Sequence, residues 1–274
     1  MKDEKGNNEV PVSQSESINP WDGIPVEMRI LCQLEYTYND REGMCVEPML
    51  NFLLAHMNDC DDPSKGVTPY DVIYWIDTGI DFCLFPVFSY EYFWLKNRDK
   101  ILSLLKRSER LIMKSDPQVL ENSTKLNENE FYKPALAVLS QKLDVYFAVC
   151  YAFRKEWDLF DEKCEAIFEA TKRNIKALLS LKDCVRIISD IHGFEFRFPC
   201  EEPWEPLMWI CDEYIFDIDL IHTLIPYCEL YVDYLQELSS DNEYAVEQLR
   251  NYAELSLRSL YETLELLLDD EDDI

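Results

Sequence analysis

The sequence predicts an all-α protein, an irregular helical bundle with at most one short strand-like segment. Two observations predict this fold class. The 274 residues are 47% hydrophobic and include 6 Trp, 16 Tyr and 14 Phe but only 6 Gly, a composition typical of packed secondary structure. Apolar residues also recur every three or four positions over most of the chain, which is the period of a helix with one buried side.

The N-terminal part begins with residues 1–20, which are polar and charged and which we expect to be a disordered segment. Residues 21–115 are expected to form a helical N-terminal part. Its apolar positions between Pro25 and Met57 predict two helices, broken around Asn39–Gly43. The stretch that follows, Asn58–Pro69, has the composition of a loop.

A third helix is expected after this loop, because Thr68 and Pro69 fit an N-cap and a first-turn proline. Residues 70–93 are so rich in aromatic and β-branched side chains that periodicity does not separate helix from strand, and Pro86 limits any helix through them. We interpret the stretch as helical. Residues 90–113 then predict a helix with its apolar side turned inward.

A polar linker over residues 116–133 is the one candidate boundary between two sub-bundles. A helical bundle is expected over 134–268. It begins with a helix from Pro134 to Phe153 and a second from Leu159 to Ile188, each with one apolar stripe. The stripes are Leu136, Leu139, Leu143, Phe147 and Cys150 in the first helix, and Phe160, Cys164, Ile167, Thr171, Ile175 and Leu178 in the second.

The C-terminal third contains the one strand-like segment, residues 193–199, where aromatic and polar side chains alternate. This pattern fits a short strand or an extended connector between helices. Ser240 to Glu243 match a capping box, and apolar spacing of three and four residues continues to Leu267. We expect a terminal helix that docks on its own bundle, the alternative being a coiled coil with a partner. Residues 269–274 follow as an acidic tail.

The ten cysteines are scattered, without a CxxC pair, and no apolar stretch of signal-peptide length stands near the N-terminus. They are therefore expected to be reduced thiols that serve mostly as small core residues. The expected location is the nucleus, the cytoplasm or both. The longest uncharged runs are far shorter than a transmembrane helix, so we expect no contact with a membrane.

No motif in the sequence predicts catalysis, and we expect a protein that is not an enzyme. The six glycines form neither GxGxxG nor a phosphate loop, so no cofactor is expected. The three histidines lack the close spacing of a metal site, and His56 with Cys60 comes nearest. Asp190 beside His192 is interpreted as a core or helix-end pair. A catalytic site that forms only in three dimensions stays open as an alternative.

The net charge of −28 predicts a basic protein partner, since it would repel nucleic acid phosphates and anionic lipids. The charge is segregated: residues 190–274 contain 23 Asp and Glu against three Arg, and no lysine follows Lys182. Solubility alone does not require such segregation. A basic island at 96–114 fits a nucleic acid contact or, as we favour, a solvated helix face paired with acidic residues of the same protein.

The candidate partner-binding residues lie in two acidic stretches of the C-terminal third. In the first, aromatic side chains interleave with carboxylates, as at many interaction surfaces, although core packing is the alternative for the aromatics. The second is the terminal acidic run. The candidates are Glu201, Glu202, Trp204, Glu205, Asp212, Glu213, Asp217, Asp269, Asp270, Glu271, Asp272 and Asp273.

Residues 144–168 resemble the helical domain of the assembly factors for box H/ACA ribonucleoproteins, chaperones that hold dyskerin-type pseudouridine synthases before RNA arrives. The likeness rests on residues 150–154 (CYAFR), similar to that family's Tyr-x-x-Arg helix end, and on residues 165–168 (EAIF), similar to its Glu-Ser-Ala-Trp. Residues 190–194 also resemble a family tract, but the spacing does not fit one gap-free register. The family's Tyr-Pro-Leu-Tyr-Arg tract is not recognisable in this chain.

The resemblance implies a helical fold whose acidic surface occupies the RNA-binding site of a partner enzyme. Together with the charge, it predicts a non-enzymatic acidic protein that binds a basic, RNA-binding protein as an assembly factor, chaperone or adaptor in ribonucleoprotein biogenesis. The alternatives are a constitutive structural subunit of a larger complex and a helical enzyme whose site is not visible in the sequence.

Overall fold

The computed structural model describes residues 23–37, 45–84, 90–114, 136–180 and 218–272. These residues form eight α-helices and two short 3-10 helices and contain no strand, which confirms the all-α prediction. The strand-like residues 193–199 and the linker 116–133 lie outside the described residues. The elements are α1 (Val26–Thr37), α2 (Val46–His56), η1 (Asp59–Asp61), η2 (Pro63–Lys65), α3 (Pro69–Leu84), α4 (Tyr90–Lys114), α6 (Leu136–Arg154), α7 (Trp157–Leu179), α10 (Ile218–Glu237) and α11 (Glu243–Asp272).

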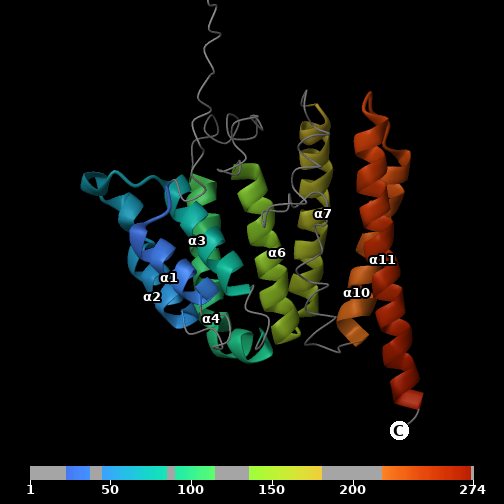
Figure 1. Ribbon diagram of the computed structural model, residues 1–274, viewed down its shortest axis with the longest axis horizontal. Helices are drawn as coiled ribbons and strands as arrows, with labels where there is room; N and C mark the ends of the chain where they lie inside the picture. Colours follow the sequence, from blue (N-terminus) through green and yellow to red (C-terminus); the bar gives the residue numbers. More distant parts are fainter. Residues whose placement is uncertain (1–22, 38–44, 85–89, 115–135, 181–217, 273–274) are drawn as a thin grey trace, which may run out of the picture.

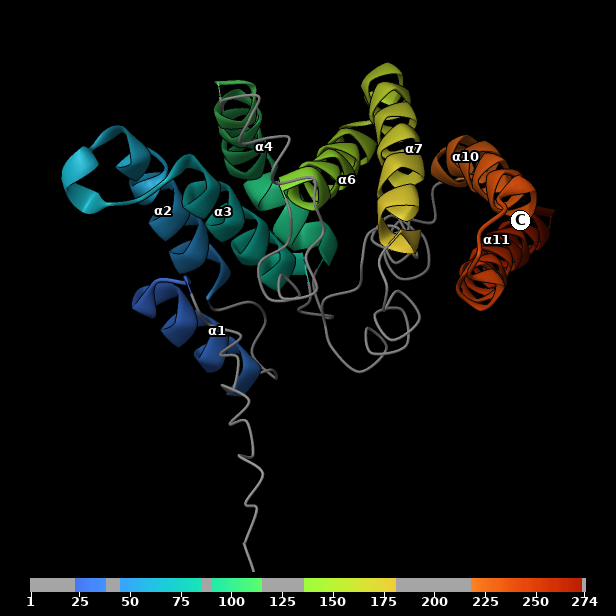
Figure 2. The same cartoon turned by 90° about the horizontal axis from the view of Figure 1, so that it is seen from above.

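The helices form an elongated array in which each packs on the helix described before it and the one described after it. Figures 1 and 2 show the progression from α1 and α2 at one end, through α6, to the α10–α11 hairpin at the other. One hydrophobic cluster includes residues from α1 to α11. Helices α4 and α6, which precede and follow residues 116–133, pack against each other within it.

Helix α6 is the buried centre of this array. It packs on α3 and α4 on one side and on α7 on the other, and every residue from Val145 to Ala152 is buried. A helix that is apolar all round must be covered all round, which explains this central place. The apolar stripe predicted for α6 is buried, as is the α7 stripe from Phe160 to Ile175, so both predictions are confirmed for these residues.

The polar side chains of α6 are paired across its interfaces. Tyr146 donates a 3.0 Å hydrogen bond to Asp77 of α3, and Lys142 lies 3.0 Å from the same carboxylate, which is only 1% exposed. Toward α7, Gln141 donates to the Thr171 hydroxyl (2.6 Å) and its carbonyl accepts from Asn174 (2.5 Å). Burying an unpaired polar group costs free energy. These hydrogen bonds and ion pairs therefore favour packing of α6 against α3 and α7 in this arrangement.

Lys163 of α7 adds an ionic link between three helices. Its ammonium group lies 2.8 Å from Asp144 of α6 and 3.3 Å from Glu109 of α4, and it stands over the Phe147 ring at 4.4 Å. Burial alone would lower the pKa of Lys163, but the two carboxylates outweigh it and raise the pKa. The lysine therefore stays charged and holds α7 against α4 and α6.

The described cysteines are structural. Cys32, Cys45, Cys150, Cys164 and Cys228 are buried, and all are free thiols. Burial raises the pKa of the Cys32 thiol to about 12 and also raises that of Cys164. Such thiols stay protonated and pack as small apolar groups. This confirms the interpretation of these cysteines as core residues.

Helix ends follow the sequence signals in one place and depart from them in another. Thr68 accepts from the Asp71 backbone, and Asp71 accepts from the Thr68 backbone, a reciprocal cap that starts α3. The helical interpretation of residues 70–93 is confirmed for the described part of that stretch, which belongs to α3 and the start of α4; residues 85–89, with Pro86, lie outside the described residues. At the start of α11, Asn242 and not Ser240 supplies the cap, accepting from the Ala245 N–H (3.2 Å).

Helices α10 and α11 form an antiparallel hairpin that ends the array (Figure 1). Arg250 of α11 closes it by donating hydrogen bonds to the backbone carbonyls of Leu235 (2.7 Å) and Leu238 (3.0 Å). Helix α10 contains Pro226, whose ring removes the donor for the carbonyl four residues earlier. Pro226 is exposed, so the freed carbonyl lies on the side of the helix where water can bond to it.

Replacing Lys142 with methionine tests whether the ion pair between Lys142 of α6 and Asp77 of α3 stabilises the fold. The change removes the Lys142 ammonium group from the buried Asp77 carboxylate, and we expect it to lower the free energy of unfolding by about 3 kcal/mol. Urea denaturation measures the loss. The matched Lys176→Met on exposed α7 surface should cost far less, and Asp77→Asn added to Lys142→Met should restore part of the loss. A small effect of Lys142→Met would show that the ion pair does not stabilise the fold.

Candidate interaction surface

Most of the predicted partner-binding residues lie outside the described residues. Glu201, Glu202, Trp204, Glu205, Asp212, Glu213 and Asp217 fall within 181–217, and Asp273 follows the last described position. Asp269, Asp270, Glu271 and Asp272 belong to the final turns of α11. The acidic run expected to follow this helix thus continues it through Asp272.

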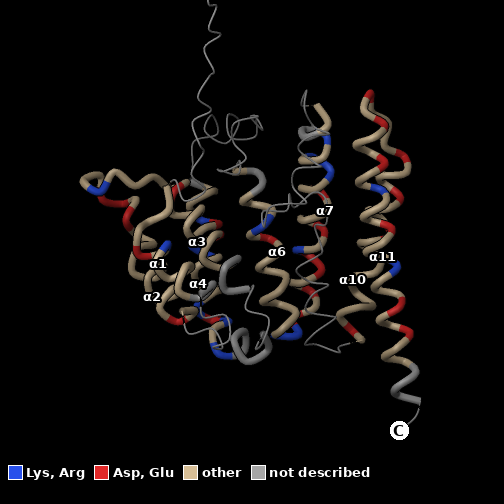
Figure 3. The backbone as a smooth tube through the Cα atoms, viewed as in Figure 1, with Lys and Arg blue, Asp and Glu red and all other residues tan. Residues whose placement is uncertain are grey.

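The described part of the C-terminal third is an acidic hairpin. Along α10 and α11 the only lysine or arginine residues are Arg250 and Arg258, and Figure 3 shows several acidic positions along this hairpin. Arg250 donates a hydrogen bond to the Leu235 carbonyl at the hairpin turn, and its guanidinium lies 3.6 Å from the Glu247 carboxylate. The acidic residues of the two helices are Asp219, Glu229, Asp233, Glu237, Glu243, Glu247, Glu254, Glu262, Glu265, Asp269, Asp270, Glu271 and Asp272.

Apart from Glu229, which accepts a hydrogen bond from Tyr261, and Glu243 in the first turn of α11, five exposed carboxylates of this hairpin form no ion pair with any residue that the structure describes. They come from both helices, so the excess negative charge extends across the pair. Uncompensated like charges raise the local negative potential, which attracts cations and opposes the approach of anions. The five residues are Asp233, Glu237, Glu254, Glu262 and Glu265.

The basic island on α4 is different, because three of its basic side chains form ion pairs within the protein. Lys96 and Lys100 of α4 both lie 3.5 Å from Glu47 of α2, and Arg107 lies 2.9 Å from Asp61. The preferred interpretation of this island, a helix face paired with acidic residues of the same chain, is confirmed for these three side chains.

Exposed apolar side chains accompany the unpaired carboxylates of α11. Tyr244, Leu255 and Leu266 are 58%, 56% and 68% exposed. The sequence reasoning missed them because it followed only the inward stripe of this helix. A signal was present: a glutamate precedes each of the three, and the Glu-apolar pair recurs every 11 residues, at 243–244, 254–255 and 265–266.

The C-terminal end of α11 carries charge of the unfavourable sign. The negative end of the helix dipole lies there, yet the last turns contain four acidic residues and no basic one. This end also extends beyond α10 (Figure 1), since α11 has 30 residues and α10 has 20. A cation bound at this end would relieve the repulsion.

Charge substitution at the two ends of α11 tests this description. We expect Asp269→Lys to raise the free energy of unfolding by about 0.5 kcal/mol, because it places a cation at the negative end of the dipole. Glu243→Lys makes the same change in net charge at the positive end and should lower stability by a similar amount. Thermal denaturation at low salt measures both. Equal shifts of the same sign would contradict the dipole argument.

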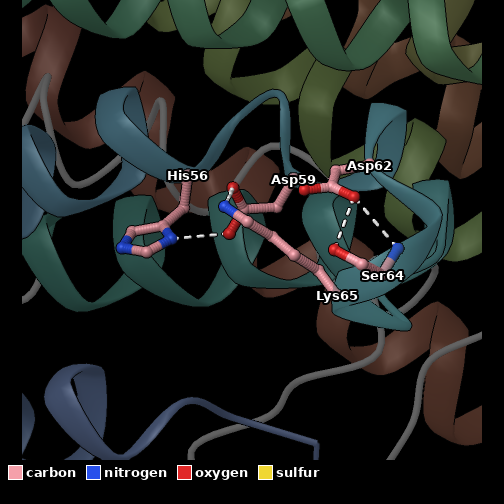
Figure 4. A network of polar contacts seen from close by, with 5 residues as sticks. All are labelled: His56, Asp59, Asp62, Ser64 and Lys65. Atoms are coloured by element: carbon pink, nitrogen blue, oxygen red, sulfur yellow. Dashed lines mark hydrogen bonds and ion pairs between the residues drawn. The ribbon is translucent and has the colours of Figure 1, made fainter.

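A second cluster of polar side chains lies between α2 and α3 (Figure 4). The buried carboxylate of Asp59 lies 2.6 Å from His56 Nδ1 and 2.5 Å from Lys65 Nζ. An aspartate that orients a histidine is part of hydrolytic triads. Here the Ser64 hydroxyl donates to Asp62 (2.7 Å), and among the described residues no nucleophile is hydrogen-bonded to His56. The cluster therefore ties the end of α2 to η1 and η2.

This cluster has a defined pH dependence. The hydrogen bond from Lys65, and after it that from His56, lowers the pKa of the Asp59 carboxyl below its usual 3.8. A lowered folded-state pKa contributes stability that is present above the unfolded-state pKa and is lost as pH falls through the folded-state pKa.

We therefore expect Asp59→Asn to lower the free energy of unfolding by about 1 kcal/mol at pH 7, with the difference from wild type shrinking as the pH falls below about 4. Urea titrations at several pH values give both free energies. Glu27→Gln on the exposed side of α1 is the control. A difference that stays constant down to pH 3 would show that the charge of Asp59 is not the cause.

In the described part of the chain, no three His, Cys, Asp or Glu side chains gather closely enough to hold a metal ion. None of the described helices is both long enough and apolar enough to span a membrane.

Protein-family models, curated proteins and solved structures were compared with this chain, and none matches it.

Proposed function

We propose that this chain is a non-enzymatic interaction protein that binds a basic protein through the outer face of the α10–α11 hairpin. One observation carries the proposal: the five carboxylates of that face without an ion pair in the described residues. Glu47, Asp61, Glu109 and Asp144, by contrast, each face a lysine or arginine of the same chain.

Solubility is the competing explanation of the acidic face, and the segregation of charge argues against it. Solubility does not require the acidic residues to be gathered on one hairpin, because charges of both signs interspersed, as they are along α7, also keep a surface soluble. Repulsion among carboxylates on the hairpin costs stability, most clearly at the C-terminal end of α11. A cationic partner offsets that cost on binding, and the same field speeds its association.

The partner class follows from charge and from the sequence resemblance together. A partner must present clustered Lys or Arg, and proteins that bind RNA phosphates do so. The resemblance of residues 144–168 to ribonucleoprotein assembly factors implies the same class. In this proposal the chain acts in the nucleus or cytoplasm as an assembly factor, chaperone or adaptor, and its carboxylates engage basic residues that would otherwise meet RNA.

Affinity purification of the full chain from cells tests the proposal. Capture is carried out at low salt and followed by a wash at about 0.5 M salt, where the Debye length falls to a few ångströms. We expect basic, RNA-binding proteins to be retained at low salt and released by the wash. A variant with Asp233→Asn, Glu254→Gln and Glu265→Gln should lose most of this material.

The matched control removes the same charge elsewhere. Asp158→Asn, Glu162→Gln and Glu165→Gln neutralise three exposed residues of α7 and should leave capture unchanged. Equal loss in both variants would mean that only net charge matters. Partners that persist at 0.5 M salt and in the hairpin variant would contradict the proposal and favour a constitutive structural subunit.

A further inference from the structure

We propose that the ligand of α11 is an amphipathic helix of the partner, with apolar and basic residues side by side, lying lengthwise along the outer face of α11. The inference rests on the proposed function and names the partner's structural class. It is carried by the apolar row Tyr244, Leu255 and Leu266 and by the glutamate that precedes each of them, all six exposed.

The 11-residue spacing keeps this row nearly straight. Eleven residues make three turns of an α-helix plus about 20°, and they rise about 16.5 Å along its axis. From Tyr244 to Leu266 the row therefore covers about 33 Å of the helix surface. A second helix laid beside α11 at a shallow angle can contact all three side chains, as in other helix recognition surfaces.

The charges beside the row specify what such a helix must carry. Glu243, Glu254 and Glu265 each lie about 100° around α11 from the apolar residue that follows, and so share one flank of the row. Glu254 and Glu265 have no ion-pair partner in the described residues. A docking helix would place Lys or Arg opposite this flank and its apolar residues over the row.

The same charges argue against an antiparallel second copy of α11 as the occupant. Two α11 helices packed antiparallel along this face would bring the glutamate flanks of both copies together, and like-charge contacts at an interface cost several kcal/mol. The exposed apolar stripe on α1, Val26, Ile30 and Leu34, lacks a glutamate before each apolar residue, and Arg29 precedes Ile30. This stripe serves as the control surface.

The test uses the full chain and a synthetic helical peptide of about 25 residues, long enough to cover the row. The peptide carries leucine and lysine side by side every 11 residues, and a second peptide of identical composition has the leucines shuffled around the helix. Fluorescence anisotropy at 0.15 M salt gives each Kd. We expect the patterned peptide to bind at least about tenfold more tightly than the shuffled one.

Two triple variants complete the design. Tyr244→Ser with Leu255→Ser and Leu266→Ser keeps every charge and should weaken the patterned peptide at least about tenfold. Val26→Ser with Ile30→Ser and Leu34→Ser should change its Kd less than about twofold, since these residues lie on α1. All six side chains are more than 40% exposed, so circular dichroism and urea titration should show folded proteins.

The outcomes separate this inference from the proposed function. Equal binding of both peptides, or an α11 serine variant within about twofold of wild type, overturns helix docking. If Glu243→Gln, Glu254→Gln and Glu265→Gln together then weaken binding, the acidic surface stands and only the docking mode fails. If that charge variant also binds like wild type, both proposals fail.

Discussion

Burial of α6 on all sides is the constraint on which the rest of the structure depends. The helix contacts α3, α4 and α7, and its interior turns leave no face for solvent. Four of its polar side chains, Gln141, Lys142, Asp144 and Tyr146, have partners on the neighbouring helices: Asp77 on α3, Thr171 and Asn174 on α7, and Lys163 of α7, which also reaches α4. Apolar packing would tolerate several arrangements of these helices, whereas buried hydrogen bonds and ion pairs favour one.

Charged side chains form ion pairs within the protein more often in one part of the array than in the other. In the half built from α2, α3, α4 and the turns between them, lysine and arginine meet carboxylates of neighbouring helices. The α10–α11 hairpin lies at the end of the array and contacts α7 through α10. Its outer face meets no further described helix, and its sequence supplies two arginines for many carboxylates. Architecture and composition together thus concentrate unpaired negative charge, with leucine and tyrosine beside it, at one end.

Much of the fold was readable from the sequence because inward stripes dominate it. The helices α4, α6 and α7 and the buried side of α11 follow spacings of three and four residues, and Thr68 with Pro69 marks a helix start that the structure keeps. Helix α10 was not predicted as an element of its own. It contains Pro226, a residue that disfavours a helix interior and that is exposed here. Ser240 looked like the cap, but Asn242, two residues nearer the helix, competes better for the free N–H groups.

The candidate surface was predictable only in outline. Composition located the acidic third, but charge counts do not say which carboxylates find partners, and that depends on the packing of α2 against α4 and of α7 against both α4 and α6. The residues first proposed, from Glu201 to Asp217, lie outside the described part. The Glu-apolar repeat on α11 was visible in the sequence, yet it acquires meaning only when the structure shows that these positions face outward.

Hydrogen–deuterium exchange on the full chain, with and without the basic protein released by salt from affinity capture, tests the central claim most directly. We predict that binding slows hydrogen exchange of the amides in α10 and α11, because the partner covers the hairpin. Exchange in α3 and α6 should stay unchanged, because these helices are already buried at the centre of the array. Protection confined to α1 or α4, with the hairpin unaffected, would contradict it.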